Sequence, residues 1–206
     1  MWVHTKKSQD KITPDIALSY LKEGNQRFIN NLKLHRNLLQ QVNLTSEGQF
    51  PFAVILSCID SRTSAEMIFD QGLGDIFSIR IAGNILNDDI LGSMEYACRT
   101  ANSKLIVVLG HTRCSAIISA CNKLELGHFT HLLSKLTPSI ENEKETTINR
   151  TGTNESFVNN VTRNNIILTI KQIREKSPIL QEMENNSSIK IIGGLYNVET
   201  GEVQFE

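Results

Sequence analysis

The sequence predicts a single-domain α/β protein with a mainly parallel β-sheet core flanked by helices and an N-terminal helical arm. A chain of 206 residues has the length of one domain. The runs FAVILS at 52–57 and LIVVL at 105–109 are continuously apolar and rich in β-branched residues. Such runs are typical of strands that are buried on both faces. Helix-like stretches alternate with them, and this alternation indicates parallel strands joined by helices.

The N-terminal region is expected to hold a loose polar arm over residues 1–12 and then a helix. Thr13 can cap this helix, Pro14 suits its first position and Asp15 complements its dipole. Gly24 interrupts the helix at a cost of about 1 kcal/mol relative to Ala. An apolar stripe at helical spacing supports the assignment: Ala17, Leu18, Leu21, Phe28, Ile29 and Leu32.

The elements between and after the two apolar runs follow from the same periodicity. Helices are expected over residues 61–69, 89–100, 115–126 and 161–175, and strands over 76–81, 189–192 and 202–205. Asn197 to Gly201 can form the turn between the last two strands. Residues 134–160 are rich in Asn, Thr, Glu and Ser, so this segment is expected to be a solvated surface loop.

Composition and charge argue against a nucleic-acid-binding protein and against a membrane protein. The chain has 21 basic and 22 acidic residues, so no strong field points to nucleic acid or an anionic membrane as a partner. No apolar run approaches the roughly 20 residues that span a bilayer. The start MWVHTKKSQDK lacks the apolar core of a secretory signal, and we expect a cytoplasmic location. There the four cysteines would be reduced, as metal ligands, nucleophiles or core residues.

Reactive side chains follow both apolar runs, where the predicted strands end. CIDSR at 58–62 follows the first run, and HTRC at 111–114 follows the second after one glycine. The carboxyl ends of parallel strands form the usual ligand crevice. Cys58, His111 and Cys114 would make a three-ligand set that leaves zinc one open position, where bound water becomes more acidic. A cysteine after a buried strand can also be only a core residue, and this alternative stays open.

Asp60 and Arg62 are close enough along the chain to form an ion pair. Such a pair keeps the carboxylate ionised. Asp60 could then accept a hydrogen bond from metal-bound water, or bind the metal itself and close the site. The simpler alternative is a surface ion pair, which is worth less than about 1 kcal/mol.

On these motifs the sequence resembles the β-class carbonic anhydrases over most of the chain. The matching segments are residues 17–28, 58–62, 69–75, 80–84, 92–97, 110–114 and 196–203. The pattern CxDxR followed by HxxC is the most specific part of the match. The resemblance implies a zinc-binding α/β catalytic domain over residues 34–206. Residues 1–33 would be an arm and helix that pack on a partner subunit, within one structural domain overall.

The resemblance also implies roles for the reactive residues. Cys58, His111 and Cys114 would hold one Zn²⁺ per subunit. Asp60 and Arg62 would orient a zinc-bound hydroxide that hydrates carbon dioxide reversibly to bicarbonate and a proton. Asp60 would be a fourth ligand only in a closed, inactive state.

The substrate pocket and the assembly are implied in the same way. Gln49 matches a glutamine that hydrogen-bonds substrate, and Phe77 and Tyr96 match aromatic residues of a narrow apolar pocket. In this family the pocket lies at a dimer interface, so a homodimer or tetramer is expected. Two other functions stay open: a hydrolase of carbonyl sulfide or carbon disulfide on the same fold, and a non-catalytic zinc-binding interaction protein.

Two positions depart from the family pattern. Ser115 stands where the family usually has glycine after the second zinc cysteine, and it could crowd the metal or cap the following helix. Ile55 stands where one branch has a tryptophan of an inhibitory bicarbonate site, although Arg80 and Tyr196 match its other two positions. We therefore expect no complete site of that kind.

Overall fold

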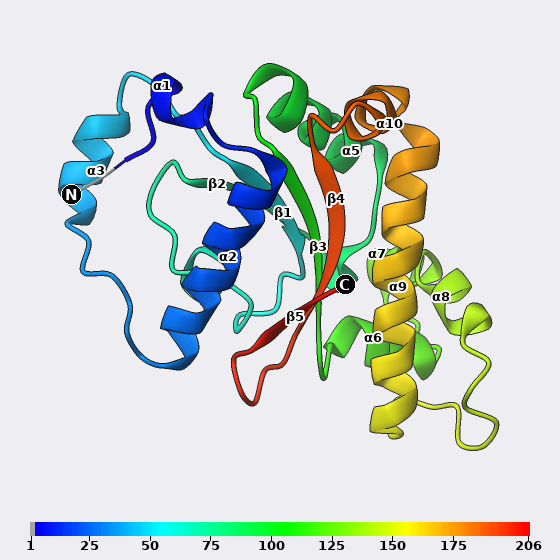
Figure 1. The fold of residues 1–206 in the computed structure, drawn as a ribbon. Helices are drawn as coiled ribbons and strands as arrows, with labels where there is room; N and C mark the ends of the chain where they lie inside the picture. Colours follow the sequence, from blue (N-terminus) through cyan, green and yellow to red (C-terminus); the bar gives the residue numbers. More distant parts are fainter. Residues whose placement is uncertain (1–2) are drawn as a thin grey trace.

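A five-stranded sheet with the strand order β2-β1-β3-β4-β5 forms the centre of the protein (Figure 1). The structure is a computed structural model, and it describes residues 3–206. β1 to β4 pair in parallel, and β5 is antiparallel to β4. The predicted, mainly parallel α/β fold is confirmed. The strands are β1 (Ala53–Ser57), β2 (Ile76–Arg80), β3 (Leu105–His111), β4 (Lys190–Tyr196) and β5 (Val203–Phe205).

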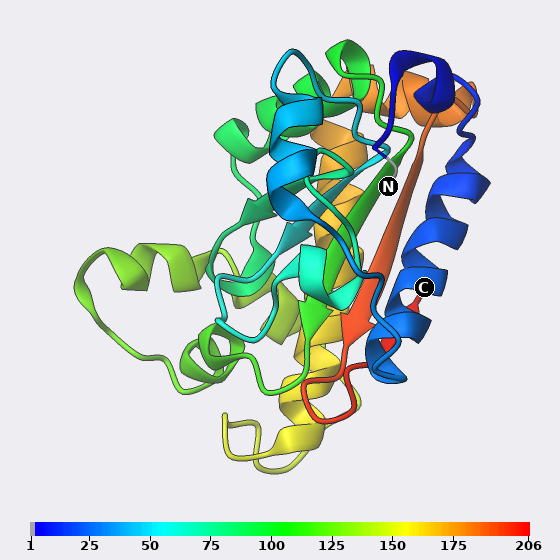
Figure 2. The same cartoon turned by 90° about the vertical axis from the view of Figure 1, so that its left-hand side faces the viewer.

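Helices cover both faces of this sheet. α2 lies on one face, and α9 runs along the other with α5 and α10 beside it (Figure 1). The segment that carries α7 and α8 projects from the body of the molecule (Figure 2). The helices are α1 (Lys6–Gln9), α2 (Pro14–Ile29), α3 (Leu38–Thr45), α4 (Ala65–Ile68), α5 (Asp88–Glu95), α6 (Ser115–Cys121), α7 (Gly127–Ser134), α8 (Thr137–Asn142), α9 (Glu155–Lys176) and α10 (Pro178–Asn185). A short 3-10 turn, η1 (Ala82–Asn84), and a π turn, η2 (Tyr96–Thr100), complete the order.

The alternation of side chains along β1 divides the core into two layers. Ala53 and Ile55 pack in the layer under α2, and Val54 and Leu56 pack in the layer under α9. Both faces of the strand are therefore buried, as the continuous apolar run predicts. Each fully buried Val, Ile or Leu side chain contributes about 1.5–3 kcal/mol.

A third apolar cluster lies at the edge of the sheet where the parallel strands end. It joins α6 to the start of α9, and includes Ile117 and Phe157 together with Cys58 and Cys114. The two cysteines are therefore held in a packed environment. Rigid supporting elements of this kind are what a precise ligand site needs.

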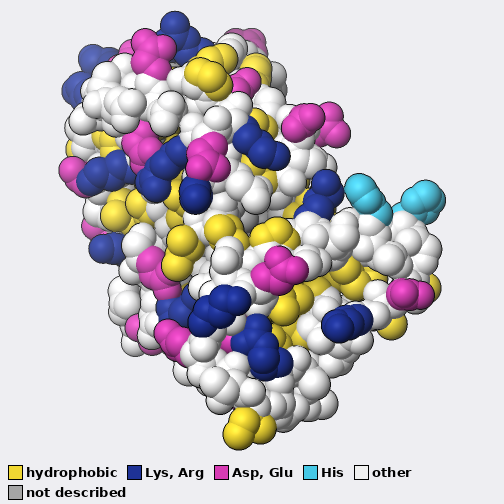
Figure 3. All heavy atoms as spheres, turned by 90° about the vertical axis from the view of Figure 1, so that its right-hand side faces the viewer, with side chains coloured by type: hydrophobic (Ala, Val, Ile, Leu, Met, Phe, Trp, Pro, Cys, Tyr) yellow, Lys and Arg dark blue, Asp and Glu magenta, His cyan; other side chains and the backbone are white. Residues whose placement is uncertain are grey.

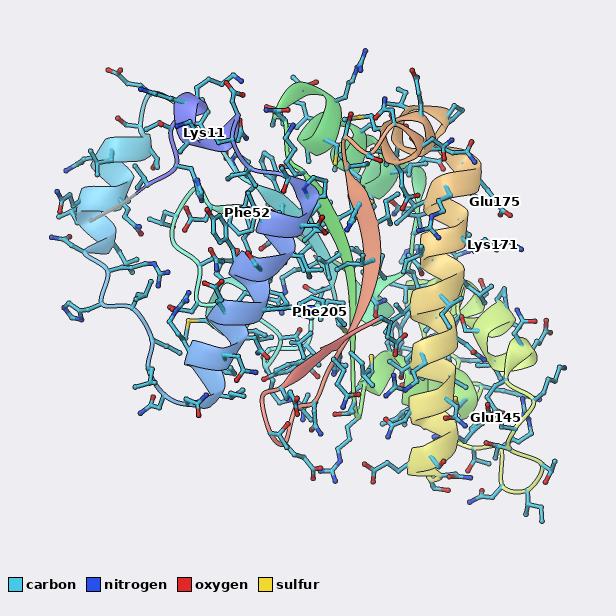
Figure 4. All side chains as sticks on the ribbon, viewed as in Figure 1. Lys11, Phe52, Glu145, Lys171, Glu175 and Phe205 are labelled. Carbon is cyan, nitrogen blue, oxygen red and sulfur yellow. The ribbon has the colours of Figure 1, made fainter. Side chains whose placement is uncertain are left out.

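The outer surfaces carry the polar side chains. Lys171 and Glu175 point from α9 away from the sheet, whereas Phe52 and Phe205 belong to the core layer under α2 (Figure 4). On the face drawn in Figure 3, basic and acidic side chains are mixed, in agreement with the balanced charge of the chain. Within residues 3–206, no helix has the length and apolar character needed to cross a membrane.

The expectation of a loose polar arm over residues 1–12 is wrong for most of that segment. α1 forms there, and Gln9 is only 1% exposed. Its Nε2 donates hydrogen bonds to the carbonyl oxygens of Pro51 and Ala101, both at 2.8 Å. A buried amide that satisfies two backbone carbonyls ties the segment to the sheet. Residues 1–2 lie outside the described part of the chain.

The expectation of a solvated loop over residues 134–160 is also wrong in part. α8 and the first turn of α9 lie within it, and Phe157 is fully buried. The side chain of Glu143 is buried as well and accepts hydrogen bonds from Arg150 and Asn160. Polar residues that satisfy one another allow this segment to fold with few large apolar residues, and composition does not reveal such pairing.

Several helix boundaries also differ from the expectation. The helix expected over 61–69 is reduced to α4, because the hydroxyl of Thr63 donates to the carbonyl oxygens of Cys58 and Asp60 and holds a turn there. The helix expected over 115–126 ends at Cys121, and that over 89–100 changes from α5 into the π turn η2. α9 begins at Glu155 rather than at 161. The helices α3, α7 and α10 are absent from the expectation.

Candidate metal centre

Three potential metal ligands meet at the carboxyl ends of β1 and β3. The ligand atoms of Cys58, His111 and Cys114 all lie within 4.8 Å of one another. Cys58 follows the last residue of β1, His111 ends β3, and Cys114 is the residue before α6. Their exposed fractions are 4%, 1% and 1%. The parallel register thus brings together the two motifs that the sequence places after separate strands.

The geometry of this group fits a tetrahedral zinc ion. The two Sγ atoms are 3.9 Å apart. Two sulfur atoms that share a tetrahedral zinc at about 2.3 Å each lie about 3.8 Å apart. Nδ1 of His111 lies 2.9 Å from the carbonyl oxygen of Thr112, so with a metal bound Nδ1 would carry the proton and Nε2 would offer its lone pair to the metal. Nε2 is buried and has no hydrogen-bond partner among the described residues, as expected of a metal ligand.

The electrostatics of the two thiols also favour a cation. The contact with the Cys114 thiol is the largest cause that lowers the pKa of Cys58, against the opposing effect of burial. His111 and the backbone N–H of Gly83 lower it further. The same contact and burial raise the pKa of Cys114. Two thiols held this close favour a cation, since a metal that binds them takes the place of their protons.

Asp60 and Arg62 form a bidentate ion pair beside the ligand group. Nε of Arg62 donates to Oδ1 of Asp60 at 2.9 Å, and Nη2 donates to Oδ2 at 2.8 Å. The side chain of Arg62 is the largest cause that lowers the pKa of Asp60 to about 2. Both carboxylate oxygens are thus engaged by Arg62, and Asp60 lies outside the group of three ligands. In this arrangement Asp60 is paired with Arg62.

Arg80 fixes the turn that carries this ion pair. From the end of β2, its Nε donates to the carbonyl oxygen of Cys58 at 3.1 Å and its Nη2 to that of Asp60 at 2.6 Å. Thr63 holds the same two carbonyls. Sequence patterns alone give no signal for the contacts of Arg80, because they depend on the pairing of β1 with β2, whereas those of Thr63 are local.

The three expected substrate residues lie away from the ligand group within one chain. Gln49 is exposed and precedes β1, whose opposite end leads into Cys58. Phe77 and Tyr96 have ring centroids 6.1 Å apart, and they line a cavity of about 720 Å³ beside β2, the edge strand. None of the three ligands lines this cavity. Their role at a site shared between two chains stays a prediction.

The two departures from the family pattern have clear places in the structure. Ser115 is the first residue of α6, and its side chain is exposed, so it does not fill the buried space at the ligands. Ile55 is buried inside the sheet. Cys98 and Cys121 are buried thiols whose pKa values are raised by burial, to about 12 and about 11. They lie in apolar clusters and belong to the core.

Comparisons with known proteins agree with the geometry. Residues 53–203 match the family model described as carbonic anhydrase. Carbonic anhydrase 2 of Mycobacterium tuberculosis is 34% identical over 195 residues, which cover 91% of this chain and 90% of the relative. The carbonic anhydrase of Mycolicibacterium smegmatis is 33% identical over 198 residues, which cover 93% and 92%.

Solved structures give the same result for the fold. The β-carbonic anhydrase CcaA aligns with a TM-score of 0.70 at 25% identity, over 91% of this chain and 94% of that one. The β-carbonic anhydrase CafA of Aspergillus fumigatus aligns with a TM-score of 0.73 at 23% identity, over 93% and 89%. Sequence, fold and ligand group lead to one conclusion: the chain belongs to the β-class carbonic anhydrase family.

Proposed function

We propose that this protein catalyses the reversible hydration of carbon dioxide to bicarbonate and a proton, with zinc held by Cys58, His111 and Cys114. The observation that carries the proposal is the buried group of three ligands with the Asp60–Arg62 ion pair in the adjoining turn. Membership of the family supports the reaction, and the spacing of the two sulfur atoms supports the choice of metal.

The reaction needs a strong nucleophile more than it needs substrate binding. Carbon dioxide is small and apolar, and water at neutral pH attacks it slowly. Zinc held by these residues would supply a water molecule whose pKa is lowered toward neutrality. Burial of the three ligands keeps bulk solvent away from this position.

Asp60 orients the attacking oxygen in this proposal. Its pKa is lowered to about 2, so it is ionised at neutral pH and can only accept hydrogen bonds. A carboxylate oxygen that accepts a hydrogen bond from the attacking oxygen orients it, so that a lone pair of that oxygen faces the carbon of the substrate. Arg62 holds the carboxylate bidentately, and Arg80 holds the turn, so the direction of approach is fixed before substrate arrives.

Substrate contacts from Gln49, Phe77 and Tyr96 require a second copy of the chain in this proposal. Tyr96 is 53% exposed although it is a large aromatic residue, and it lies with Phe77 by the edge strand of the sheet. An exposed aromatic surface of this kind fits a homodimer or a larger assembly. We also place the protein in the cytoplasm, where its four free thiols stay reduced.

Stopped-flow measurement of carbon dioxide hydration tests the proposal. We expect activity from the zinc-loaded protein and a fall of about 100-fold in turnover for Asp60→Asn, with zinc retained. Glu184→Gln is the matched control, because Glu184 is also a carboxylate held bidentately by an arginine, Arg174, but this pair joins α10 to α9 away from the ligand group. Turnover of Asp60→Asn equal to that of the control would remove Asp60 from the mechanism. No hydration by the zinc-loaded protein would remove the proposed reaction.

A further inference from the structure

We propose that Asn165, with Ser139 behind it, is a positioning residue for the metal ligand Cys58 and acts through Gly83. The inference rests on the proposed zinc site. It concerns a chain of three hydrogen bonds that links α8 and α9 to one ligand sulfur. Neither Asn165 nor Ser139 belongs to the motifs that carry the family resemblance.

The first link joins η1 to the ligand. The backbone N–H of Gly83 donates to Sγ of Cys58 at 3.3 Å. Gly83 has a φ of 66° and Asn84 a φ of 40°, so two successive residues adopt the left-handed conformation. An N–H aimed at a thiolate withdraws electron density from the sulfur, and so affects how strongly the sulfur donates to a metal.

Packing alone does not account for the position of Gly83. A Cβ added there would meet Cδ1 of Leu136 at 3.1 Å and Cβ of Ala116 at 3.4 Å, so the turn is pressed against α6 and the residue before α8. These apolar contacts limit how far the turn can move inward. They supply no force that keeps its N–H directed toward Cys58, because apolar contacts are not directional.

The second link supplies that direction. Asn165 lies on α9 and is 3% exposed. Its Nδ2 donates to the carbonyl oxygen of Gly83 at 2.9 Å. Gly83 is thus held on both sides, by Asn165 at its carbonyl and by Cys58 at its N–H. The N–H of Asn84 also donates to the carbonyl oxygen of Ile81 at 2.9 Å, so the peptide groups on both sides of Gly83 are held. A rotation of the Gly83 N–H away from the sulfur therefore disturbs buried hydrogen bonds.

The third link orients the amide of Asn165. Oγ of Ser139, which is 1% exposed, donates to Oδ1 of Asn165 at 3.2 Å. A cavity of about 180 Å³ is lined by both residues, so the amide has space to turn away from Gly83. The bond from Ser139 holds the amide with Nδ2 toward the turn. This assigns a function to α8, which lies within the segment 134–160 that the sequence predicts to be a solvated surface loop.

Cobalt substitution reports directly on the sulfur that Gly83 contacts. In the Co²⁺-loaded protein, the thiolate-to-cobalt absorption band moves to longer wavelength when a ligand sulfur becomes richer in electrons. We expect this shift in Asn165→Leu, which keeps the size of the side chain and removes both hydrogen bonds. We also expect zinc, measured by competition with a chelator, to bind about tenfold more weakly, because Cys58 loses the hydrogen bond that holds it in position, and this loss outweighs the stronger donation from its sulfur.

Two further variants keep the test decisive. Ser139→Ala leaves Asn165 in place and is expected to shift the band in the same direction by a smaller amount, so it decides the question if Asn165→Leu does not fold. Thr162→Val is the matched control. Thr162 is equally buried on α9, but among the described residues its hydroxyl bonds only to the carbonyl oxygen of Val158. Its band and zinc affinity are expected to equal those of the wild type.

The outcomes separate the inference from the proposed function. If the band of Asn165→Leu lies at the wild-type wavelength, the positioning role is overturned and the metal site stays intact. If Asn165→Leu does not fold, an unshifted band in Ser139→Ala has the same meaning. A wild-type protein that binds Co²⁺ without any thiolate band overturns the metal site, and the inference with it. An equal shift in Thr162→Val would show that any disturbance of α9 moves the band, and would also overturn the specific role of Asn165.

Discussion

Replacing Gly24 by alanine should destabilise the protein, although helix propensity alone predicts the opposite. Gly24 lies in the middle of α2, where alanine would be favoured by about 1 kcal/mol. In the folded protein, however, a Cβ at this position would lie 1.7 Å from the carbonyl oxygen of Phe69 and 2.7 Å from its carbonyl carbon. These are backbone atoms, which cannot rotate out of the way as the end of a side chain can.

The size of the effect follows from what must move. A carbon and a carbonyl oxygen approach to about 3.3 Å, so α2 would have to shift by roughly 1.5 Å. The side chain of Asn25 joins α2 to the rest of the protein through three hydrogen bonds, with the carbonyls of Ile68 and Gly201 and the N–H of Val203. Each is worth about 1 kcal/mol. The variant would lose most of these hydrogen bonds and gain packing strain, and the helix-propensity gain offsets only part of this. We expect a net decrease of about 3 kcal/mol in the free energy of unfolding.

Urea unfolding followed by circular dichroism, at one protein concentration, measures this loss. Gln26→Gly is the matched control, because Gln26 is exposed on the same helix and should cost only the propensity difference of about 1 kcal/mol. A Gly24→Ala protein as stable as the wild type, or more stable, would refute the reasoning. It would mean that α2 does not rest on the segment at Phe69.

Three other predictions concern charge, metal and pH. Asp70→Ala should lower the free energy of unfolding, measured in urea, by about 2–3 kcal/mol, because the buried carboxylate forms ion pairs with Arg27 and Arg36 and its removal leaves both cations unpaired by it. An unchanged urea midpoint would contradict this. Cys58→Ser should abolish stoichiometric zinc binding by metal analysis, and full occupancy would remove Cys58 from the ligand set. Burial lowers the pKa of His4 to about 4. Below about pH 6.5 the imidazole of the unfolded chain is therefore protonated while that of the folded chain is still neutral, and the folded state loses stability as pH falls toward 4. Between pH 7 and 5 the wild type should therefore lose about 1 kcal/mol more than His4→Phe, and equal losses would contradict the shift.

The strands and the ligand group could be predicted because their signals are local. A continuous apolar run indicates a buried strand wherever it lies, and Cys58 and His111 come directly after or at the end of such strands. Once the strands are known to be parallel, the two motifs must meet at one edge of the sheet. The pairing of Asp60 with Arg62 is local as well.

Contacts between distant segments could not be predicted in this way. Asn165 and Gly83 are 82 positions apart, and nothing in the composition of either segment joins them. Gly24 shows the same limit, since helix propensity treats it as a defect, whereas the tertiary structure needs the space that it leaves. Gln49, Phe77 and Tyr96 were predicted only through the family resemblance, because a single chain does not bring them to the ligands.

Titration of the metal-free protein with zinc, with carbon dioxide hydration measured at each step by stopped flow, tests the central claim most directly. If Cys58, His111 and Cys114 hold the metal that drives the reaction, activity should rise in proportion to added zinc and stop rising at one zinc per chain. Activity in the fully stripped protein, or one bound zinc per chain with no hydration, would contradict it.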